Sequence, residues 1–426
     1  MDVKGANPNP PPVVPTAKEI SILRRLAGEV RARAEHPRTL ERRRQWRLLY
    51  ELKAERPLIL AEFGWHEIRP EPLVCEDPLL RSWEDWLRQV IYRFDVVDDD
   101  ALVWPSFPVQ WQIKIYDSHD GHNLPRHVSD DAVGYAYVPL IKDISRLAEE
   151  VGRLPHERLE VDREATHRQL ELAARIFGDI LPPRLYFVPG CYKWSLGLTY
   201  DAVHLVGYNE FIMALCDNPD GVHALLAFLR DDWTASLDYM EREGLLTPDW
   251  ASVNGLGDVT PGGRPTPPGD GQAGLADLWG FAECQEMAVA SPRMFEEFIM
   301  PYLAPITSRF GYISYGCCEP LDDRLDIVRR YIRNLRKIGV TPWANQECYA
   351  HIDSLVLSRR PNPAMVCTRF NEDEIRADIR KTLDILGRCQ LELVMKDVVT
   401  LQNEAERIPR WVRIVREEIA RHYGNV

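Results

Sequence analysis

The chain has 426 residues, of which 45% are hydrophobic and 27% charged, and its formal net charge is −13. This composition is that of a globular protein with a large core, and the acidic excess disfavours nucleic acid or an anionic membrane surface as a partner. No apolar run is long enough for a membrane helix, and residues 1–15 read as a disordered tail without the apolar segment of a secretion signal, so we expect a cytoplasmic protein.

The first part of the chain predicts a helical extension followed by the start of an α/β domain. Residues 16–56 carry apolar side chains at helical intervals, which indicates one or two outer helices without a chemical role. The apolar run 58–63 predicts the first buried strand, and His66 follows its end. The acidic run 98–100 is typical of a turn or a solvated face. Further predicted segments are a helix at 79–94, a strand at 107–115, a polar loop at 116–127, a strand at 185–188 and a helical stretch at 211–245.

The second part alternates strands and helices more regularly. The predicted segments are a strand at 251–254, a loop at 261–272, a helix from Ser291 to about 310, strands at 312–315, 340–344, 354–358 and 390–395, and helices at 321–338, 371–388 and 404–423. This alternation predicts parallel βα units. We therefore predict a (β/α)8 TIM barrel over residues 57–426, preceded by the helical extension.

Polar residues collect just after the predicted strands, where a barrel places its active site. Charged groups at such positions are costly to bury unless they are paired or used, so their concentration predicts an active site. The residues are His66, Cys317, Cys318, Glu319, Asn345, Glu347, Arg359, Arg360, Asn362, Lys396 and Asp397.

The nine cysteines show no disulfide-like spacing and should be free thiols. Most should be small buried residues, as expected for Cys75, Cys216, Cys348 and Cys367. The adjacent pair Cys317 and Cys318 differs from these, because it follows a predicted strand directly.

Three interpretations of the adjacent cysteines remain open. They are a pair of ligands for a soft metal such as zinc, a reactive thiol, or two packed thiols of which only one faces the pocket. Candidates to complete a zinc site are Glu283, Cys284, Glu286, His351 and Cys389. Lys396 and Asp397 are either a structural ion pair or a working acid–base pair. A lysine at this position can bind a substrate carboxylate or lose its proton when it is desolvated.

Several segments together resemble the uroporphyrinogen decarboxylase-like superfamily over roughly residues 180 to 420. They are residues 276–286, 291–302, 310–311, 315–320, 334–336, 342–344 and 396–398. The resemblance implies a (β/α)8 barrel with its active site at the carboxyl ends of the strands, and it makes a homodimer plausible. The superfamily includes a decarboxylase without a cofactor, whose Arg-rich N-terminal signature is absent here, and zinc-dependent methyl transfer with a corrinoid protein.

In the methyl-transfer branch, a His-x-Cys triplet after one strand and a later cysteine hold the zinc. Here the triplet is Tyr315-Gly316-Cys317, and the later strand end carries Lys396 and Asp397, so only Cys317 matches directly. The resemblance favours a zinc-thiolate methyltransferase whose methyl carrier, a corrinoid or a similar group, is bound to a separate protein.

The residues then receive the following expected roles. The zinc ligands are Cys317, Cys318 and Glu286; the catalytic residues are Lys396, Asp397 and His66; the substrate-binding residues are Tyr315, Glu319, Asn345, Arg360 and Trp279. One alternative is a metal-independent decarboxylase that binds a polycarboxylate through Arg360 and Lys396. The other is a barrel that binds a small molecule without turnover.

Overall fold

The structure is a computed structural model that describes residues 13–62, 64–69, 71–119, 126–128, 135–247 and 273–424. The predicted strand 251–254 and loop 261–272 lie outside these residues, as do the first twelve residues of the predicted tail. None of the described helices is long and apolar enough to cross a membrane.

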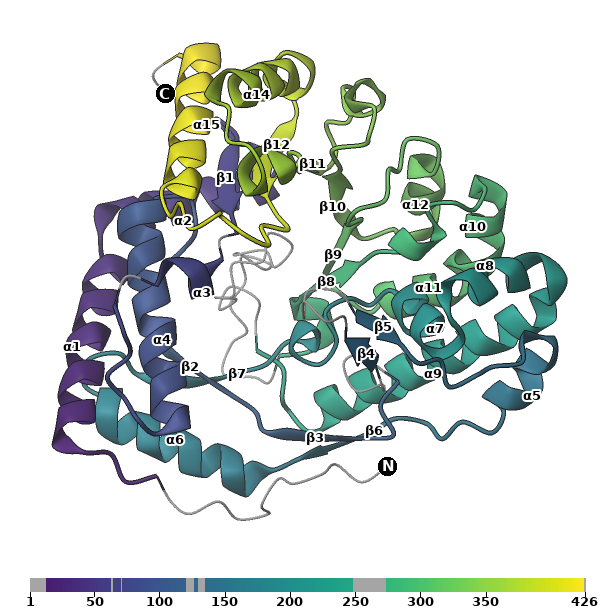
Figure 1. The fold of residues 1–426 in the computed structure, drawn as a ribbon, viewed down its shortest axis with the longest axis horizontal. Coiled ribbons are helices and arrows are strands. Elements are labelled where there is room, and N and C mark those ends of the chain that lie inside the picture. The colour runs from purple at the N-terminus through teal and green to yellow at the C-terminus, as the bar shows by residue number, and fades with distance from the viewer. Residues whose placement is uncertain are drawn as a thin grey trace.

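Helices cover the outside of the main group of strands (Figure 1). Those of the first half are α1 (Ala17–Ala34), α2 (Pro37–Tyr50), α3 (Trp65–Ile68), α4 (Pro78–Tyr92), α5 (Leu147–Val151), α6 (Arg163–Phe177), α7 (Leu198–Val206), α8 (Tyr208–Asp217) and α9 (Pro219–Arg242). Those of the second half are α10 (Pro292–Phe298), α11 (Met300–Thr307), α12 (Leu325–Tyr331), α13 (Ala364–Cys367), α14 (Glu372–Leu386) and α15 (Arg407–Tyr423).

The main sheet has six parallel strands in the order β1-β12-β11-β10-β9-β8. A separate parallel pair is formed by β2 and β7. The strands are β1 (Leu58–Ala61), β2 (Phe107–Gln110), β3 (Ile113–Tyr116), β4 (Arg126–Val128), β5 (Tyr135–Tyr137), β6 (Arg158–Val161), β7 (Pro183–Tyr186), β8 (Trp279–Ala282), β9 (Tyr312–Tyr315), β10 (Leu335–Val340), β11 (Val356–Arg359) and β12 (Gln390–Met395). The predicted α/β class is confirmed, whereas the strand pairings of the described residues do not show a closed ring.

The predicted boundary between the helix 321–338 and the strand 340–344 was wrong. The helix α12 ends at Tyr331, and β10 already spans Leu335–Val340. β10 contains Lys337, and this charged residue made the segment resemble the exposed face of a helix in the sequence. In the structure the Lys337 ammonium is buried and lies 3.0 Å from Glu392 Oε1 on β12. A partner distant in the sequence therefore makes a charged residue acceptable inside the sheet.

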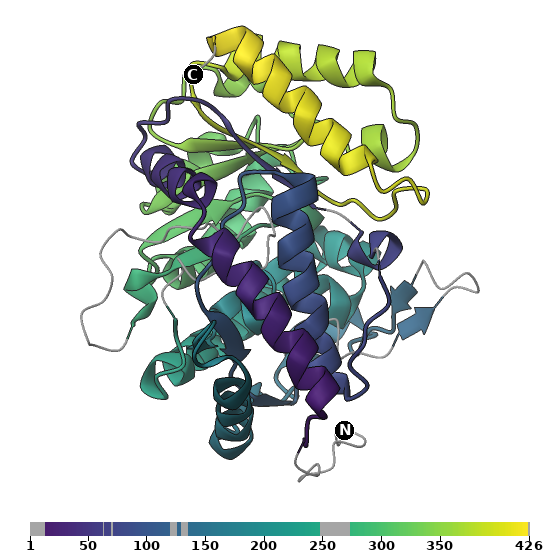
Figure 2. The same ribbon diagram turned by 90° about the vertical axis from the view of Figure 1, so that its left-hand side faces the viewer.

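Side chains alternate along the strands, so one face of the sheet collects every second residue. On β1 and β12 this face carries Leu58 and Val394, and at the carboxyl ends it carries Glu62 and Lys396. The helix α2 packs Trp46 and other apolar side chains against the start of this face. The N-terminal extension therefore covers the end of the sheet opposite the predicted active site, while α1 runs beside α4 (Figure 2).

The acidic run 98–100 was predicted to be solvated, and the structure contradicts this for two of its residues. Asp99 and Asp100 are each only 1% exposed. Asp100 Oδ2 accepts the backbone N–H of Ile59 at 2.9 Å, and Arg56 and Arg416 pair with the same carboxylate. The arginines come from distant parts of the chain, which is why the local sequence gave no sign of the burial.

All nine cysteines are free thiols in the structure. Cys75 and Cys367 are buried as expected, but Cys216 and Cys348 are exposed, so the prediction was wrong for these two. Both exposed thiols lie in helical segments at the surface, where a small side chain is tolerated without burial.

Candidate active site

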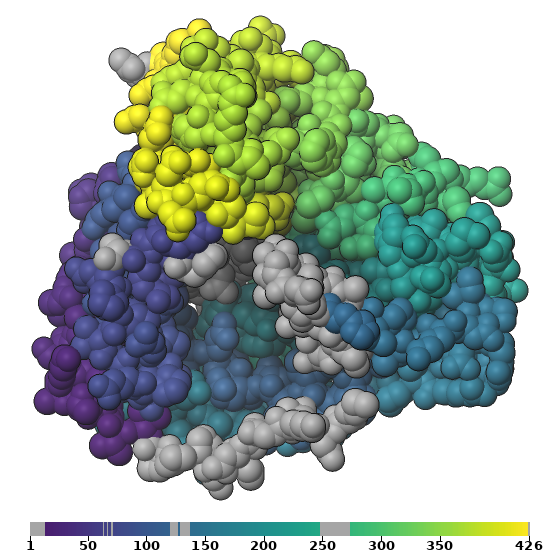
Figure 3. Space-filling view, in the orientation of Figure 1, coloured from purple at the N-terminus to yellow at the C-terminus, as the bar shows by residue number. Residues whose placement is uncertain are grey.

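A cavity of about 400 Å³ lies at the carboxyl ends of β1, β7, β9 and β12 and extends along β8. In the space-filling view the molecule is hollowed near its centre (Figure 3). The described lining residues are Glu62, Tyr186, Val188, Pro189, Gly190, Cys191, Lys193, Trp194, Ser195, Leu196, Trp279, Gly280, Phe281, Gln285, Cys317, Cys318, Lys396 and Asp397. The cavity thus joins side chains from segments as distant as β1 and β12, at the end where parallel βα folds place their sites.

Both adjacent thiols line this cavity. Consecutive residues of a strand point to opposite faces, but Gly316 has a φ of +98° and turns the chain directly after β9. The Sγ atoms of Cys317 and Cys318 consequently lie 3.7 Å apart, with Cys317 buried and Cys318 exposed. The interpretation in which only one thiol faces the pocket is wrong.

Charged groups of opposite sign lie next to the two sulfurs. Lys396 Nζ is 3.7 Å from Cys317 Sγ, and Asp397 Oδ2 is 3.8 Å from Cys318 Sγ. The pKa of Cys318 is lowered, chiefly by the hydrogen bond from Cys317, while burial and Asp397 oppose the shift and Arg360 and Lys396 support it. A lowered pKa increases the fraction of thiolate, which is the nucleophilic form.

The backbone of Cys317 is held from both sides by buried charged groups. Glu319 accepts the N–H of Cys317 at 2.9 Å through one oxygen and the N–H of Cys284 at 3.0 Å through the other. Arg360 donates to the carbonyl oxygen of Cys317. Burial raises the pKa of Glu319. Glu319 and Arg360, both expected to bind substrate, lie behind the cavity and position Cys317.

The segment after β12 is fixed by an acidic residue that the sequence analysis did not select. Asp397 adopts a left-handed backbone conformation with a φ of 59°, and its N–H donates to Glu62 Oε2 at 2.7 Å. Lys396 then directs its ammonium group over the ring of Phe281, at 5.7 Å from the centroid. Glu62 follows an apolar strand in the same way as the residues that were selected, so the same criterion would have found it.

A second missed residue is Lys193, which follows β7 and lines the cavity. Its ammonium lies 2.7 Å from Asp201 Oδ2 and 2.9 Å from Glu157 Oε2. Burial works against the charged form, but the two carboxylates outweigh it and hold the pKa of Lys193 well above its ordinary value. Lys193 is thus a fixed positive charge at the cavity wall, and the carboxylates of Asp201 and Glu157 neutralise it.

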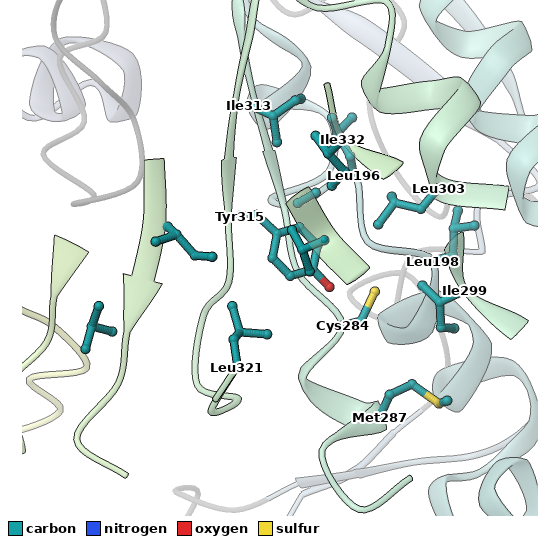
Figure 4. Close-up of a cluster of buried hydrophobic side chains, with 14 of the residues drawn as sticks. Leu196, Leu198, Cys284, Met287, Ile299, Leu303, Ile313, Tyr315, Leu321 and Ile332 are labelled. Atoms are coloured by element: carbon teal, nitrogen blue, oxygen red, sulfur yellow. The ribbon is translucent and has the colours of Figure 1, made fainter. Parts of the chain in front are cut away.

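Several residues expected in the site lie elsewhere. Tyr315 is fully buried among apolar side chains, with its hydroxyl directed toward Cys284 (Figure 4). Asn345 caps the short helix after it by accepting the N–H of Glu347. The side chain of His66 is outside the described residues, so its expected acid–base role stays a prediction. Of the expected residues, those that line the cavity are Trp279, Cys317, Cys318, Lys396 and Asp397.

The expected zinc ligands are only partly assembled. The 3.7 Å between the two sulfurs suits two thiolates on one tetrahedral ion, given a zinc–sulfur distance of about 2.3 Å. Glu286, however, is not among the described lining residues, and its carboxylate accepts the hydroxyl of Thr199 at 2.7 Å. Within the described ranges no three His, Cys, Asp or Glu side chains form a group that could hold a metal. Among the described residues, the expected donors that lie together are thus the two thiols of Cys317 and Cys318.

The chain matches no family model and no curated protein by sequence. Among solved structures it is similar to a methyltransferase from Methanosarcina mazei, with 10% sequence identity and a TM-score of 0.48 over 87% of this chain and 97% of that chain. At this level the likeness carries no argument about function, which has to come from the residues of the cavity.

Proposed function

We propose that this protein is a methyltransferase-like enzyme that acts on a small molecule at the thiols of Cys317 and Cys318. The observation that carries the proposal is the position of both sulfurs on one cavity, with a cation beside one and a lowered pKa at the other. We also propose that β2 and β7 complete a ring of eight strands with the main sheet, which would make the cavity the mouth of a (β/α)8 barrel.

The proposed chemistry uses the Cys318 thiolate as a nucleophile. Its sulfur attacks the methyl carbon of a donor, a sulfur–carbon bond forms, and the bond between the methyl group and the donor breaks as the donor leaves with the electron pair. A nucleophilic acceptor then takes the methyl group, and the thiolate is restored. Lys396 favours the anionic form of the neighbouring sulfur, and Trp194, Trp279 and Phe281 provide apolar walls that exclude water from the reacting atoms.

Zinc and a corrinoid carrier belong to the proposal through the family resemblance alone. If zinc binds, Cys317 and Cys318 would hold it, and the ion would lower the pKa of a bound substrate thiol. The described residues supply two of the three protein ligands that a catalytic zinc site requires.

The test is methyl transfer from methylcobalamin to a panel of thiol, amine and phenol acceptors, together with zinc analysis of the purified protein. We expect turnover in the unmodified protein and a loss of at least about 100-fold in Cys318→Ser, because a hydroxyl is a far weaker nucleophile at neutral pH. Cys317→Ser should reduce turnover less, because Cys317 acts as a hydrogen-bond partner of the Cys318 sulfur and not as the nucleophile. Cys348→Ser removes an exposed thiol that does not line the cavity and should keep full activity.

Each outcome discriminates between the proposals. Full activity in both cavity variants would disprove the thiol mechanism. Zinc bound in equal amount to the protein, and lost in Cys317→Ser, would restore the metal-dependent version. Release of carbon dioxide from a polycarboxylate in the presence of a chelator would instead favour the decarboxylase. That alternative has support from the Lys396 ammonium in the cavity, whereas its second carboxylate-binding residue, Arg360, is engaged with the backbone of Cys317.

A further inference from the structure

A second cavity, of about 340 Å³, lies along β2 and is separate from the thiols. Its walls come from α4, β2, α6 and β7, which lie together in one part of the molecule (Figure 1). It touches all four residues of β2. Because successive side chains of a strand point to opposite faces, a cavity that meets all of them borders the edge of the strand. Backbone groups at that edge are therefore within reach of an occupant.

Aromatic rings form the rigid part of the wall. The ring of Phe107 meets Trp86 edge-on at 5.3 Å and Trp83 edge-on at 5.2 Å between centroids. Phe107 and Trp83 are buried, so their rings are fixed by the surrounding core. Flat apolar surfaces held in this way favour a planar ligand group, which can stack or pack edge-on against them.

Three glutamine amides form the polar part of the wall. Gln112 Nε2 donates to the carbonyl oxygen of Gln110 at 3.2 Å and to Gln169 Oε1 at 3.4 Å. These two bonds use the donors of Gln112, while its side-chain oxygen and the NH₂ group of Gln169 remain available as acceptor and donor within the part of the chain that the structure describes. An amide or lactam presents the complementary donor and acceptor on one edge.

The charge of the wall restricts the ligand further. None of the described residues around this cavity carries a charge, in contrast to the thiol cavity with its two lysines and two carboxylates. An ionised ligand group would lose water without gaining a counter-charge, which is unfavourable. A neutral group with hydrogen-bonding edges avoids this cost.

We infer that this cavity is a second small-molecule site that binds a neutral, planar group with an amide or lactam edge. The aromatic rings hold its faces, and the glutamines hold its polar edge. Tyr186 lines both cavities and is the register partner of Gln110, so the bound group lies next to the thiol cavity. Binding here does not require the thiols, and the inference goes beyond the proposed function.

The test is titration of the protein with benzamide, followed by tryptophan fluorescence, with benzoate as the charged analogue. We expect benzamide to change the fluorescence and benzoate to bind at least about tenfold more weakly, because the carboxylate must be desolvated. Gln112→Leu and Gln169→Leu should each weaken benzamide binding about tenfold by leaving its polar edge unpaired. Gln89→Leu is the matched control, since Gln89 is on α4 but does not line the cavity.

Folding of each variant is checked by thermal unfolding. Gln112 is only partly buried and lies outside the helices and strands, so its replacement provides a folded variant even if Gln169→Leu is unstable. Equal binding of benzamide and benzoate, no fluorescence response to benzamide, or unchanged binding in Gln112→Leu would each overturn the inference. Cys318→Ser should bind benzamide normally while it loses methyl transfer, so failure of this inference and failure of the proposed function are distinguishable.

Discussion

At the scale of single residues, the two adjacent thiols have different surroundings although they are neighbours in the chain. Cys317 is buried, its backbone is held by Glu319 and Arg360, and its sulfur faces the Lys396 ammonium. Cys318 is exposed to the cavity and faces Asp397. The Cys317 sulfur is thus held in place as a hydrogen-bond partner of Cys318, and the Cys318 sulfur is the accessible nucleophile.

The pH dependence of Cys318 alkylation tests this division. Only the thiolate reacts with iodoacetamide, so a lowered pKa moves the midpoint of the rate profile below the value of about 8.5 for an ordinary cysteine. Lys396→Met removes a cation that favours the thiolate and should raise the midpoint. Asp397→Asn removes an anion that disfavours it and should lower the midpoint. The site of alkylation and its rate are followed by peptide mass spectrometry.

The opposite signs of these two shifts are the decisive result. Midpoints that move in the same direction, or that do not move, would contradict the electrostatic account of the pair. Alkylation of the exposed Cys348 in the same digest reports reagent quality and provides an internal control.

At the scale of elements, the main sheet contains a buried ion pair between strands that are not neighbours. Lys337 on β10 and Glu392 on β12 are 1% and 0% exposed, and β11 lies between their strands. Their charged ends meet at 3.0 Å, and Glu392 lies on the same face of β12 as Val394 and Lys396. The pair therefore links β10 to β12 across β11.

Removing one partner of this pair should destabilise the protein much more than removing both. We expect Lys337→Met to lower the free energy of unfolding by about 3–5 kcal/mol, because it leaves the Glu392 charge buried without its ion-pair partner. The double variant Lys337→Met with Glu392→Leu should recover most of that loss, since neither charge remains. Urea unfolding curves of the three proteins measure the difference, and equal destabilisation by the single and the double variant would contradict it.

At the scale of the whole molecule, the N-terminal extension closes the end of the sheet opposite the cavity. Trp46 of α2 is fully buried in a cluster with side chains from β1, β8, β11 and β12. Its indole N–H donates to the carbonyl oxygen of Asp100 at 2.7 Å, and the Asp100 carboxylate pairs with Arg416 of α15. The first and last parts of the chain are thereby connected through one buried region.

This arrangement predicts that Trp46 is important for global stability. We expect Trp46→Ala to lower the free energy of unfolding by about 3–5 kcal/mol through the cavity it creates. Trp343→Ala is the control, because Trp343 is 66% exposed, and it should change stability by no more than about 0.5 kcal/mol. Unfolding followed by circular dichroism measures both, and a small effect of Trp46→Ala would mean that α2 is merely a surface helix.

The sequence by itself determined the features that depend on local pattern. Apolar runs and helical periodicity predicted most helices and the α/β class, and polar residues after the strands predicted Cys317, Cys318, Lys396 and Asp397 at one site. Parallel strands end at the same edge of a sheet, so a polar residue directly after any of these strands is expected at that edge.

Only the tertiary structure decided which polar residues face the cavity and which are buried behind it. Tyr315 and Glu319 flank the thiols in sequence, yet one packs in the core and the other holds backbone N–H groups. Asp100 and Lys337 were misjudged for the same reason. A charge can be buried when a partner arrives from elsewhere in the chain, and periodicity carries no information about that partner.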